Sequence, residues 1–374
     1  MSADQPITYA AAGVDVEAGD RAVALMRDLV AKAQRPEVVG GLGGFVGLFD
    51  ASALKGYRRP LLATSTDGVG TKVAIAQAMD VHDTIGFDLV GMVVDDLVVC
   101  GAEPLFMTDY IACGAVVPER IAAVVKGIAQ ACAQAGCALL GGETAEHPGL
   151  LGPSEYDVAG AATGVVEADR VLGPERVRSG DVLVALASSG LHSNGYSLVR
   201  RVIQVAGWGL ERQVDELGRT LGEELLEPTR VYAADILDLA RADCVDVHAV
   251  SHVTGGGLAA NLARVLPRGL EAVVDRGTWT PTPVFELVRS LGSVPVADLE
   301  RTLNMGVGMV VVVAADDAPA AINRLAGRGV PAWVLGEVRP EQPVSGDDVT
   351  NGTVTKGSKG VDGGAVRLVG THPR

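Results

Sequence analysis

The chain has 374 residues, of which 48% are apolar and 21% are charged, and its formal net charge is −15. This length and composition indicate a globular protein with room for two domains, and they exclude a disordered chain. The sequence contains no basic stripe, so nucleic acid and anionic membranes are poor partners, and no apolar run is long enough to predict a membrane span.

Cysteine usage and the first residues bear on the compartment. Five cysteines are present, an odd number without a Cys-x-x-Cys pair. This usage is typical of a reduced, cytoplasmic protein rather than of a disulfide scaffold. The first residues also lack a basic region followed by an apolar stretch, so we expect no signal peptide and a cytoplasmic location.

Strands and helices alternate through the first 172 residues. A glycine-rich loop occupies 40–47. Apolar periodicity and the positions of proline and glycine predict helices at 21–33, 83–100 and 118–135, and strands at 61–63, 105–112, 137–140 and 157–167. The alternation predicts a mixed α/β domain over residues 1–172.

A run of turn residues around 173–181 marks a domain boundary, after which a second alternating cycle begins. We expect strands at 182–187, 248–250, 271–274, 308–314 and 332–338, and helices at 196–205, 258–266, 284–290 and 318–327. This predicts a second α/β or α+β domain over 173–339. Residues 340–374 are rich in Gly, Ser, Asp and Thr with little apolar periodicity, so we expect a disordered tail there.

The segment from Ser65 to Lys72 reads Ser-Thr-Asp-Gly-Val-Gly-Thr-Lys and stands between an apolar strand and a helix start. An aspartate, two glycines and a lysine at such a junction suit a magnesium–phosphate site. The segment is not a P-loop, because the order is Gly-Thr-Lys rather than Gly-Lys-Ser/Thr. It also fails the dinucleotide fingerprint, since Val73 stands at the third glycine position.

Several acidic residues lie near glycine turns or on the helix at 83–100, and carboxylates of this kind are the ligands that Mg²⁺ prefers. They are Asp67, Asp95, Asp96, Asp109 and Glu143. Asp88 and Asp95 share one helix face, and solvent exposure explains them equally well. Asp96 is flanked by valines and leucines, so we expect it to need a partner or a metal.

Three further loops have the composition of anion sites. The loop 40–47 could place backbone N–H groups against phosphates, with Lys32 and Lys72 as charge partners, although a mobile surface loop has the same pattern. The loop 188–197 gathers hydroxyls, an amide and His192 before a helix, and His192 could act as an acid or base near neutrality. The loop 254–257 has the same context. Serine hydrolase and zinc protease motifs are absent from the sequence.

Taken together, these segments resemble the aminoimidazole ribonucleotide synthetase (phosphoribosylformylglycinamidine cyclo-ligase) family. The matching stretches are 9–15, 35–45, 66–72, 82–86, 96–99, 101–106, 141–146, 156–160, 188–200, 228–230 and 254–257. The resemblance covers residues 9 to about 338 and none of the tail. It implies a homodimer whose N-terminal α/β domains pair through their strands, each with an α+β C-terminal domain.

The resemblance also implies the chemistry. ATP with Mg²⁺ would phosphorylate the formyl-amide oxygen of formylglycinamidine ribonucleotide, after which the amidine nitrogen would close the imidazole ring. A further metal-binding aspartate of the related selenophosphate synthetases aligns with His252, so that ligand is absent here. The departure argues against a selenophosphate function.

Site roles follow from matching positions. Asp67, Asp96 and Glu143 would hold Mg²⁺, and His192 would transfer a proton or contact phosphate. The predicted ATP contacts are Lys32, Gly41, Gly43, Gly44, Gly68, Gly70, Thr71, Lys72 and Glu143, and the predicted contacts to the substrate's ribose phosphate are Ser193, Asn194, Thr254, Gly255 and Gly256. The alternatives are another synthetase of the superfamily, such as formylglycinamidine ribonucleotide synthetase, and a non-catalytic nucleotide-binding protein.

Overall fold

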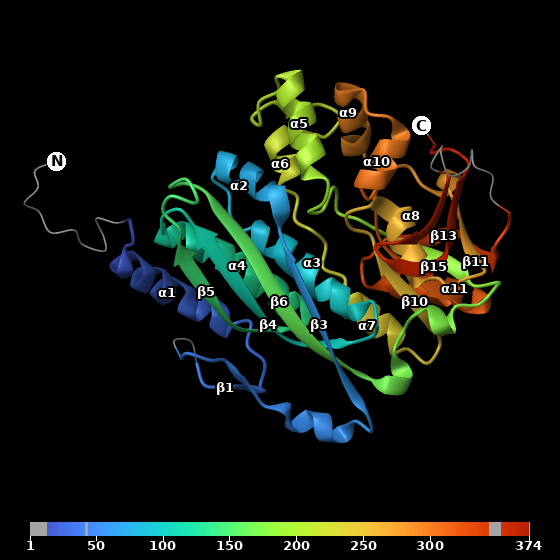
Figure 1. Cartoon of the computed structure of the whole chain (residues 1–374), viewed down its shortest axis with the longest axis horizontal. Coiled ribbons are helices and arrows are strands. Elements are labelled where there is room, and N and C mark those ends of the chain that lie inside the picture. Colours follow the sequence, from blue (N-terminus) through green and yellow to red (C-terminus); the bar gives the residue numbers. More distant parts are fainter. Residues whose placement is uncertain (1–12, 42–43, 344–352, 374) are drawn as a thin grey trace, which may run out of the picture.

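The computed structural model describes residues 13–41, 44–343 and 353–373. In Figure 1 a blue-to-green N-terminal part stands beside a yellow-to-red C-terminal part, and each part is built on its own β-sheet. The mixed α/β architecture expected from the alternating pattern is confirmed.

The N-terminal part is a four-stranded sheet with helices on one face. The strands run in the order β3 (Pro60–Gly68), β6 (Tyr156–Glu167), β4 (Glu103–Cys113) and β5 (Ala138–Glu146). Helix α3 (Ile85–Val98) packs on β3 and β6, α4 (Pro118–Ala135) packs on α3, and α1 (Val16–Ala31) packs on α4. Strands β3 and β6 cross in front of α3 and α4 in Figure 1.

Local signals place these helices close to where the sequence predicts them. Pro118 occupies the first turn of α4, and Gly136 ends the helix in the left-handed conformation with φ of 69°. The predicted strand at 61–63 is longer in the structure and reaches Gly68. Asp67 is therefore the penultimate residue of a strand and does not lie in a loop.

Smaller elements complete both parts. They are β1 (Val38–Val39), β2 (Leu48–Phe49), α2 (Val73–Met79), β8 (Gln213–Val214), β9 (Arg219–Thr220) and α6 (Leu221–Leu225).

The C-terminal part is built on a seven-stranded sheet. The strands run in the order β10 (Val247–His252), β12 (Val307–Val313), β7 (Val182–Ala187), β13 (Ala332–Pro340), β11 (Leu270–Asp275), β15 (Val361–Val369) and β14 (Val354–Ser358). Every residue of β12 is buried, as expected for an interior strand that is covered on both faces. Every residue of β10 is also buried, although β10 is an edge strand of this sheet. The helices are α5 (Tyr196–Ala206), α7 (Ala233–Ala240), α8 (Gly257–Leu262), α9 (Pro283–Gly292), α10 (Val296–Thr302) and α11 (Ala318–Gly327).

The prediction of a disordered tail over 340–374 is wrong for the described part of that range. β14 and β15 form an antiparallel hairpin, and β15 pairs in parallel with β11. Gly363 and Gly364 approach the backbone around Ala263 and Leu266 so closely that side chains there would clash. The glycines that suggested disorder are thus a requirement of tight docking. Residues 344–352 lie outside the described residues.

The interpretation of the aspartates on α3 also needs correction. Asp88 and Asp95 are fully buried, whereas Asp96 is exposed. The reason is that α3 lies between the N-terminal sheet, α4 and α7, so only a narrow stripe of the helix meets solvent. Polar groups of the C-terminal part bond to both carboxylates: Asp95 accepts from the Tyr232 backbone N–H at 3.0 Å, and Oδ1 of Asp88 accepts from the Thr229 backbone N–H at 3.0 Å. Among the described residues, Oδ2 of Asp88 has no hydrogen-bond partner.

Asp88 and Lys72 form a buried ion pair of the N-terminal part that also bonds to the C-terminal part. The Lys72 ammonium donates to Asp88 at 2.7 Å and to the backbone carbonyls of His192 and Glu227 at 3.1 and 2.6 Å. Asp88 also accepts from the Thr229 hydroxyl at 2.6 Å and from its N–H at 3.0 Å. Burial raises the pKa of Asp88 and lowers the pKa of Lys72, and the attraction between the two charges opposes both shifts.

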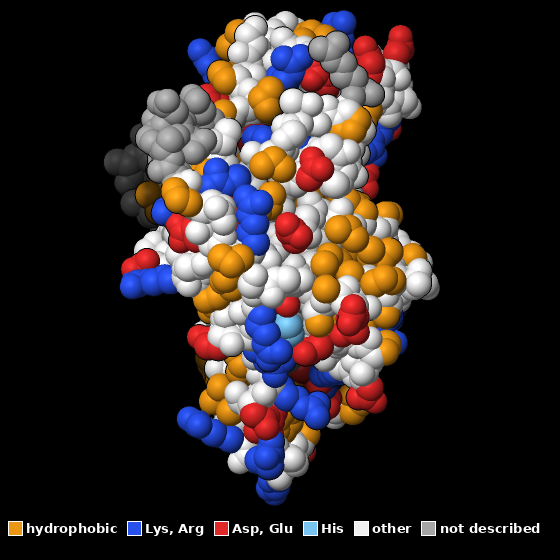
Figure 2. Space-filling model, turned by 90° about the vertical axis from the view of Figure 1, so that its right-hand side faces the viewer, with side chains coloured by type: hydrophobic (Ala, Val, Ile, Leu, Met, Phe, Trp, Pro, Cys, Tyr) orange, Lys and Arg blue, Asp and Glu red, His pale blue; other side chains and the backbone are white. Residues whose placement is uncertain are grey.

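The face of the molecule shown in Figure 2 carries both positive and negative side chains. On the face in Figure 2, Lys and Arg side chains occur in separate groups, with acidic and hydrophobic side chains between them. Within the described ranges, no helix combines the length and apolarity needed to cross a bilayer.

Replacing Lys72 by Met should destabilise the protein strongly, because it leaves the Asp88 carboxylate buried without its cation. We expect a loss of about 3–5 kcal/mol in the free energy of unfolding, measured by urea denaturation. The double variant Lys72→Met/Asp88→Asn should lose less than the sum of the single variants. A loss below about 1 kcal/mol for Lys72→Met would contradict the structural role.

Candidate active site

Five segments from both parts of the chain meet beside the Lys72–Asp88 contact. They are the end of β3 with the turn that follows it, the C-terminal end of α3, the loop 188–195, the end of β10 and the loop 254–257. Most of the residues that the sequence predicts to be functional lie in these segments.

Asp67 and Asp96 form an exposed pair of carboxylates at this junction. Asp96 accepts a hydrogen bond from Nδ1 of His252 at 2.9 Å, and Asp67 accepts from the Gly68 N–H at 2.7 Å. Partial burial and then the negative charge of Asp96 raise the pKa of Asp67. The site therefore presents two carboxylates whose mutual repulsion a cation would relieve.

His252 supports Asp96 from behind. Its ring is buried at the end of β10, and Nε2 has no hydrogen-bond partner among the described residues. Burial opposes its charged form, but the hydrogen bond to Asp96 and the charges of Asp96, Asp95 and Asp67 raise its pKa. In the sequence, His252 stands out only as the replacement of a metal ligand. Its position just before the loop 254–257 is the signal that could have indicated a role in orienting Asp96.

The two carboxylates suit a magnesium site that is completed by water and substrate phosphates, rather than a site made only of protein ligands. No group of three or more His, Cys, Asp and Glu side chains is arranged to hold a metal within the part of the chain that the structure describes. Mg²⁺ is commonly held by one or two carboxylates, with water and substrate phosphates as the remaining ligands. Asp67 and Asp96 match that requirement.

Glu143 stands apart from this pair. It lies on the edge strand β5. Across the sheet, residues in register form rows, and the row of Glu143 contains Tyr110 and Gly68. Asp67 lies in the neighbouring row, with Gly160, Asp109 and Gly142. Adjacent rows face opposite sides of a sheet, and three strand spacings amount to about 14 Å. Within one chain, Glu143 therefore does not share an ion with Asp67.

The loops 188–195 and 254–257 are tied to the N-terminal part and to each other. The Ser193 hydroxyl donates to the Val69 carbonyl at 2.6 Å. The Gly255 N–H donates to Oδ1 of Asn194 at 2.9 Å, and the Thr71 and Ser197 hydroxyls lie 3.2 Å apart. These bonds place the predicted substrate contacts next to the carboxylate pair.

The loop 254–257 has a fixed shape. Asn261 is 2% exposed and donates to the carbonyls of Thr254 and Gly257 at 3.1 and 2.8 Å. Gly256 and Gly257 have φ of 105° and 74°, and a side chain at Gly257 would clash with the Glu300 carbonyl. The glycines here are thus required by backbone conformation and close packing.

His192 and Lys72 are less accessible than the sequence suggested. The His192 ring is 1% exposed, Nε2 accepts from the Ser189 N–H at 3.1 Å, and burial lowers its pKa well below the usual value. Proton transfer by this neutral ring would require the loop to open. Lys72 is fully buried at the contact between the two parts, so it cannot touch a ligand directly.

The predicted glycine-loop contacts lie at a different place. Lys32 is exposed just after α1, Gly41 and Gly44 are exposed, and Gly43 lies outside the described residues. Between α1 and β5 there is a cavity of about 300 Å³, whose lining includes Glu143, Gly142 and Asp109. Asp109 stands on β4 in these apolar surroundings, and burial raises its pKa to about 7.

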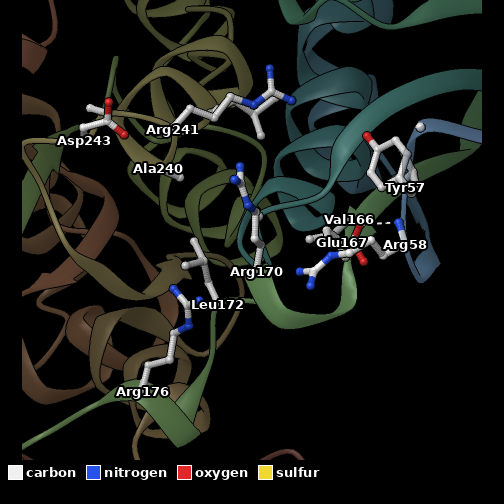
Figure 3. Close-up of a pocket in the computed structure, with 15 residues that line it drawn as sticks. Tyr57, Arg58, Val166, Glu167, Arg170, Leu172, Arg176, Ala240, Arg241 and Asp243 are labelled. Carbon is white, nitrogen blue, oxygen red and sulfur yellow. Dashed lines mark hydrogen bonds between the residues drawn. The ribbon is translucent and has the colours of Figure 1, made fainter. Parts of the chain in front are cut away.

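A larger cavity, of about 680 Å³, lies elsewhere. Arg58, Arg170, Arg176 and Arg241 line it, between β6 and the region around α7 (Figure 3). Arg241 pairs with Glu103, and Arg58 pairs with Asp169. Among the described residues, none that the sequence predicts to be functional lines this cavity, so we do not place the active site there.

Comparison with known proteins identifies the family. Residues 50–166 match the model described as AIR synthase related protein, N-terminal domain, and residues 178–348 match the corresponding C-terminal domain. Phosphoribosylformylglycinamidine cyclo-ligase of Geobacillus kaustophilus (strain HTA426) is 51% identical over 338 residues, which is 90% of this chain and 97% of that protein. The chain belongs to the phosphoribosylformylglycinamidine cyclo-ligase family. The enzyme of the same name from Anaeromyxobacter sp. (strain Fw109-5) is 52% identical over 89% of this chain and 96% of its own length.

Solved structures show the same fold at low sequence identity. Thiamine-monophosphate kinase from Stenotrophomonas maltophilia K279a is 19% identical, with a TM-score of 0.64 over 94% of this chain and 97% of that one. E. coli HypE, a hydrogenase maturation protein, is 18% identical, with a TM-score of 0.61 over 93% and 92%. A HypE structure in complex with ATP is 20% identical, with a TM-score of 0.55 over 86% of both chains.

The partly buried carboxyl group of Asp109 predicts a pH dependence of stability. A pKa near 7 in the folded protein, against about 3.9 in the unfolded chain, means that the folded state binds the proton more tightly. Stability from this group is present at low pH and is lost as pH rises towards 7. Between pH 5 and pH 8 the wild type should lose about 2–3 kcal/mol of unfolding free energy that Asp109→Asn does not lose, measured by urea unfolding.

The exposed aspartate Asp215 provides the control for this comparison. Asp215→Asn should follow the wild-type pH profile, because its carboxylate is exposed in the folded protein. Parallel profiles for wild type and Asp109→Asn would show that Asp109 ionises normally and would contradict the prediction.

Proposed function

We propose that this chain catalyses the ATP-dependent cyclisation of formylglycinamidine ribonucleotide to aminoimidazole ribonucleotide, with release of ADP and phosphate, in de novo purine biosynthesis. The observation that carries the proposal is the match of about half of all residues, over nearly the full length, to curated cyclo-ligases. The exposed Asp67–Asp96 pair beside two ordered loops supplies a site for this reaction.

ATP and Mg²⁺ are the proposed cofactors. The neighbour HypE binds ATP in its solved complex, which supports nucleotide binding by this fold. Asp67 and Asp96 would hold Mg²⁺, with His252 fixing the orientation of Asp96. Held by these residues, Mg²⁺ would supply positive charge to offset the negative charge of the transferred phosphoryl group.

The chain's own residues would mainly bind and orient the reactants. Ser193, Asn194 and the loop 254–256 would hold the ribose phosphate, while Gly68, Gly70 and Thr71 would let the end of β3 approach the ATP phosphates. The open-chain substrate would be phosphorylated on its formyl-amide oxygen, and the amidine nitrogen would then attack the same carbon and expel phosphate. Holding the chain folded supplies the proximity that ring closure needs.

The remaining predicted contacts take more distant roles in the proposal. Lys32, the loop 40–47 and Glu143 would contact ATP from the region around α1 and β5. His192 would hold the loop 188–195 in shape through its bond with Ser189, and Lys72 would act only through the packing of the domains.

We also propose that the protein is a cytoplasmic homodimer, in which the N-terminal domains pair through their strands. The helix-free face of the four-stranded sheet exposes apolar side chains, among them Leu62 at 64% and Tyr110 at 42%. Exposed apolar surface of this kind is typical of protein interfaces.

The direct test is to mix the protein with magnesium-ATP and formylglycinamidine ribonucleotide and to follow aminoimidazole ribonucleotide by a diazo colour assay, with ADP release measured in parallel. We expect both products in equal amounts. Formation of neither product by the folded protein would refute the proposed function.

Asp96→Asn tests the carboxylate pair. The variant keeps an oxygen that can accept from His252 but removes the charge, so the protein should remain folded while kcat falls by about 100-fold, equivalent to about 2.7 kcal/mol. The magnesium concentration needed for half-maximal ADP release should rise. Asp298→Asn, at an exposed position on α10, is the matched control and should retain full turnover. Near-normal turnover by Asp96→Asn would refute the metal assignment.

A further inference from the structure

The C-terminal hairpin β14–β15 lies past the end of the C-terminal family-model match at residue 348. It extends the seven-stranded sheet, since β15 pairs in parallel with β11 from Glu271 opposite Ala365 to Asp275 opposite Val369. Figure 1 shows β15 in red beside β11 on the C-terminal side of the molecule. The hairpin is thus an integral part of the C-terminal sheet.

Ion pairs and ring contacts fix this hairpin in place. Glu271 is fully buried and pairs with Arg367 of β15 and with Arg339 of β13. Beyond β15, the His372 ring packs edge-on against Trp279 at 4.5 Å between centroids and lies 3.5 Å from Glu300. These contacts hold the C-terminal end of β15, and the pairing of Ser358 with Val361 fixes the turn between β14 and β15.

That turn carries Lys359 to the loop 254–257. Its Nζ lies 3.5 Å from Oδ1 of Asn261, and its Cε would be 3.9 Å from a side chain built on Gly256. Nη1 of Arg264 also lies 3.5 Å from Oδ1 of Asn261. Two exposed cations therefore flank the loop that Asn261 shapes.

The carboxylates of Asp67 and Asp96 influence the charge of Lys359 but form no ion pair with it. Across the described ranges, no carboxylate forms an ion pair with Lys359 or Arg264. Partial burial and then the charge of Arg264 lower the pKa of Lys359, whereas the charges of Asp96 and Asp67 raise it. An anion between the two cations would relieve their repulsion.

We propose that Lys359, supplied by the C-terminal hairpin, binds a phosphate group of the substrate at the loop 254–257, together with Arg264. The inference rests on the proposed function and adds to it a substrate-binding residue from outside the matched family domains. A lysine ammonium suits this task because it offers three donors and a compact charge to a phosphate oxygen.

Two phosphates of the reaction have the required chemistry: the phosphate monoester of the nucleotide substrate and the terminal phosphate of ATP. Lys359 lies against Gly256 and Asn261 and makes no ion pair with Asp67 or Asp96, which would hold the ATP-bound metal. We therefore assign the monoester to this position.

The test compares Lys359→Met, Lys359→Arg and Lys356→Met. Lys356 lies on the same hairpin and pairs with Glu341, so its variant controls for loss of a hairpin lysine. Lys359→Met should raise KM for formylglycinamidine ribonucleotide about 10-fold or more, equivalent to about 1.4 kcal/mol, with KM for ATP unchanged. Lys359→Arg should recover most of the loss, and Lys356→Met should behave as wild type. Thermal melting should show equal stability for all variants.

Binding of ribose 5-phosphate, measured by calorimetry, provides a readout that does not depend on turnover. The wild type should bind it more tightly than Lys359→Met does, even if the wild type fails to form aminoimidazole ribonucleotide, so failure of the proposed function remains distinguishable. Equal ribose 5-phosphate binding by wild type and Lys359→Met would overturn the inference. A rise in KM for ATP alone would also overturn it, by placing the other phosphate against Lys359.

Discussion

The buried contact between Lys72 and Asp88 holds the candidate site together. Lys72 closes the turn after β3, Asp88 lies on α3, and their remaining bonds reach the loop 188–195 and the segment 227–229. A charge pair without solvent exposure depends on the hydrogen bonds that it makes, because each lost partner would leave a desolvated polar group. The contact therefore fixes the position of four segments at once, and the site residues are their neighbours in sequence.

The same geometry separates aspartates of equal chemistry into different roles. Asp88 and Asp95 lie one helical heptad apart on the buried face of α3 and serve the packing of the two domains. Asp96, one residue further and about 100° around the helix, emerges at the surface facing Asp67. The proposed metal-binding pair thus depends on where α3 is covered by its neighbours, which is a tertiary property.

This dependence explains which parts of the site the sequence could predict. Asp67, Asp96, Asn194 and Gly255 stand in recognisable segments, and the structure brings these segments together. The burial of Asp95 and the exposure of Asp96 could not be read from flanking valines, because both residues have the same neighbours in sequence. Likewise, the position of Glu143 follows from strand order, in which β6 and β4 lie between β3 and β5.

The C-terminal hairpin is a second feature that the sequence alone could not predict. Its glycines and polar residues have the composition of a disordered segment, yet Gly363 and Gly364 are the residues that let β15 approach the chain around Ala263 and Leu266. Composition alone cannot distinguish glycine that permits disorder from glycine that permits contact. The partner surface decides, and here it lies directly behind the loop 254–257. The proposed site thereby has carboxylates at one end and the cation of Lys359 at the other. Carboxylates suit a metal–phosphate complex, and a cation suits a separate phosphate monoester.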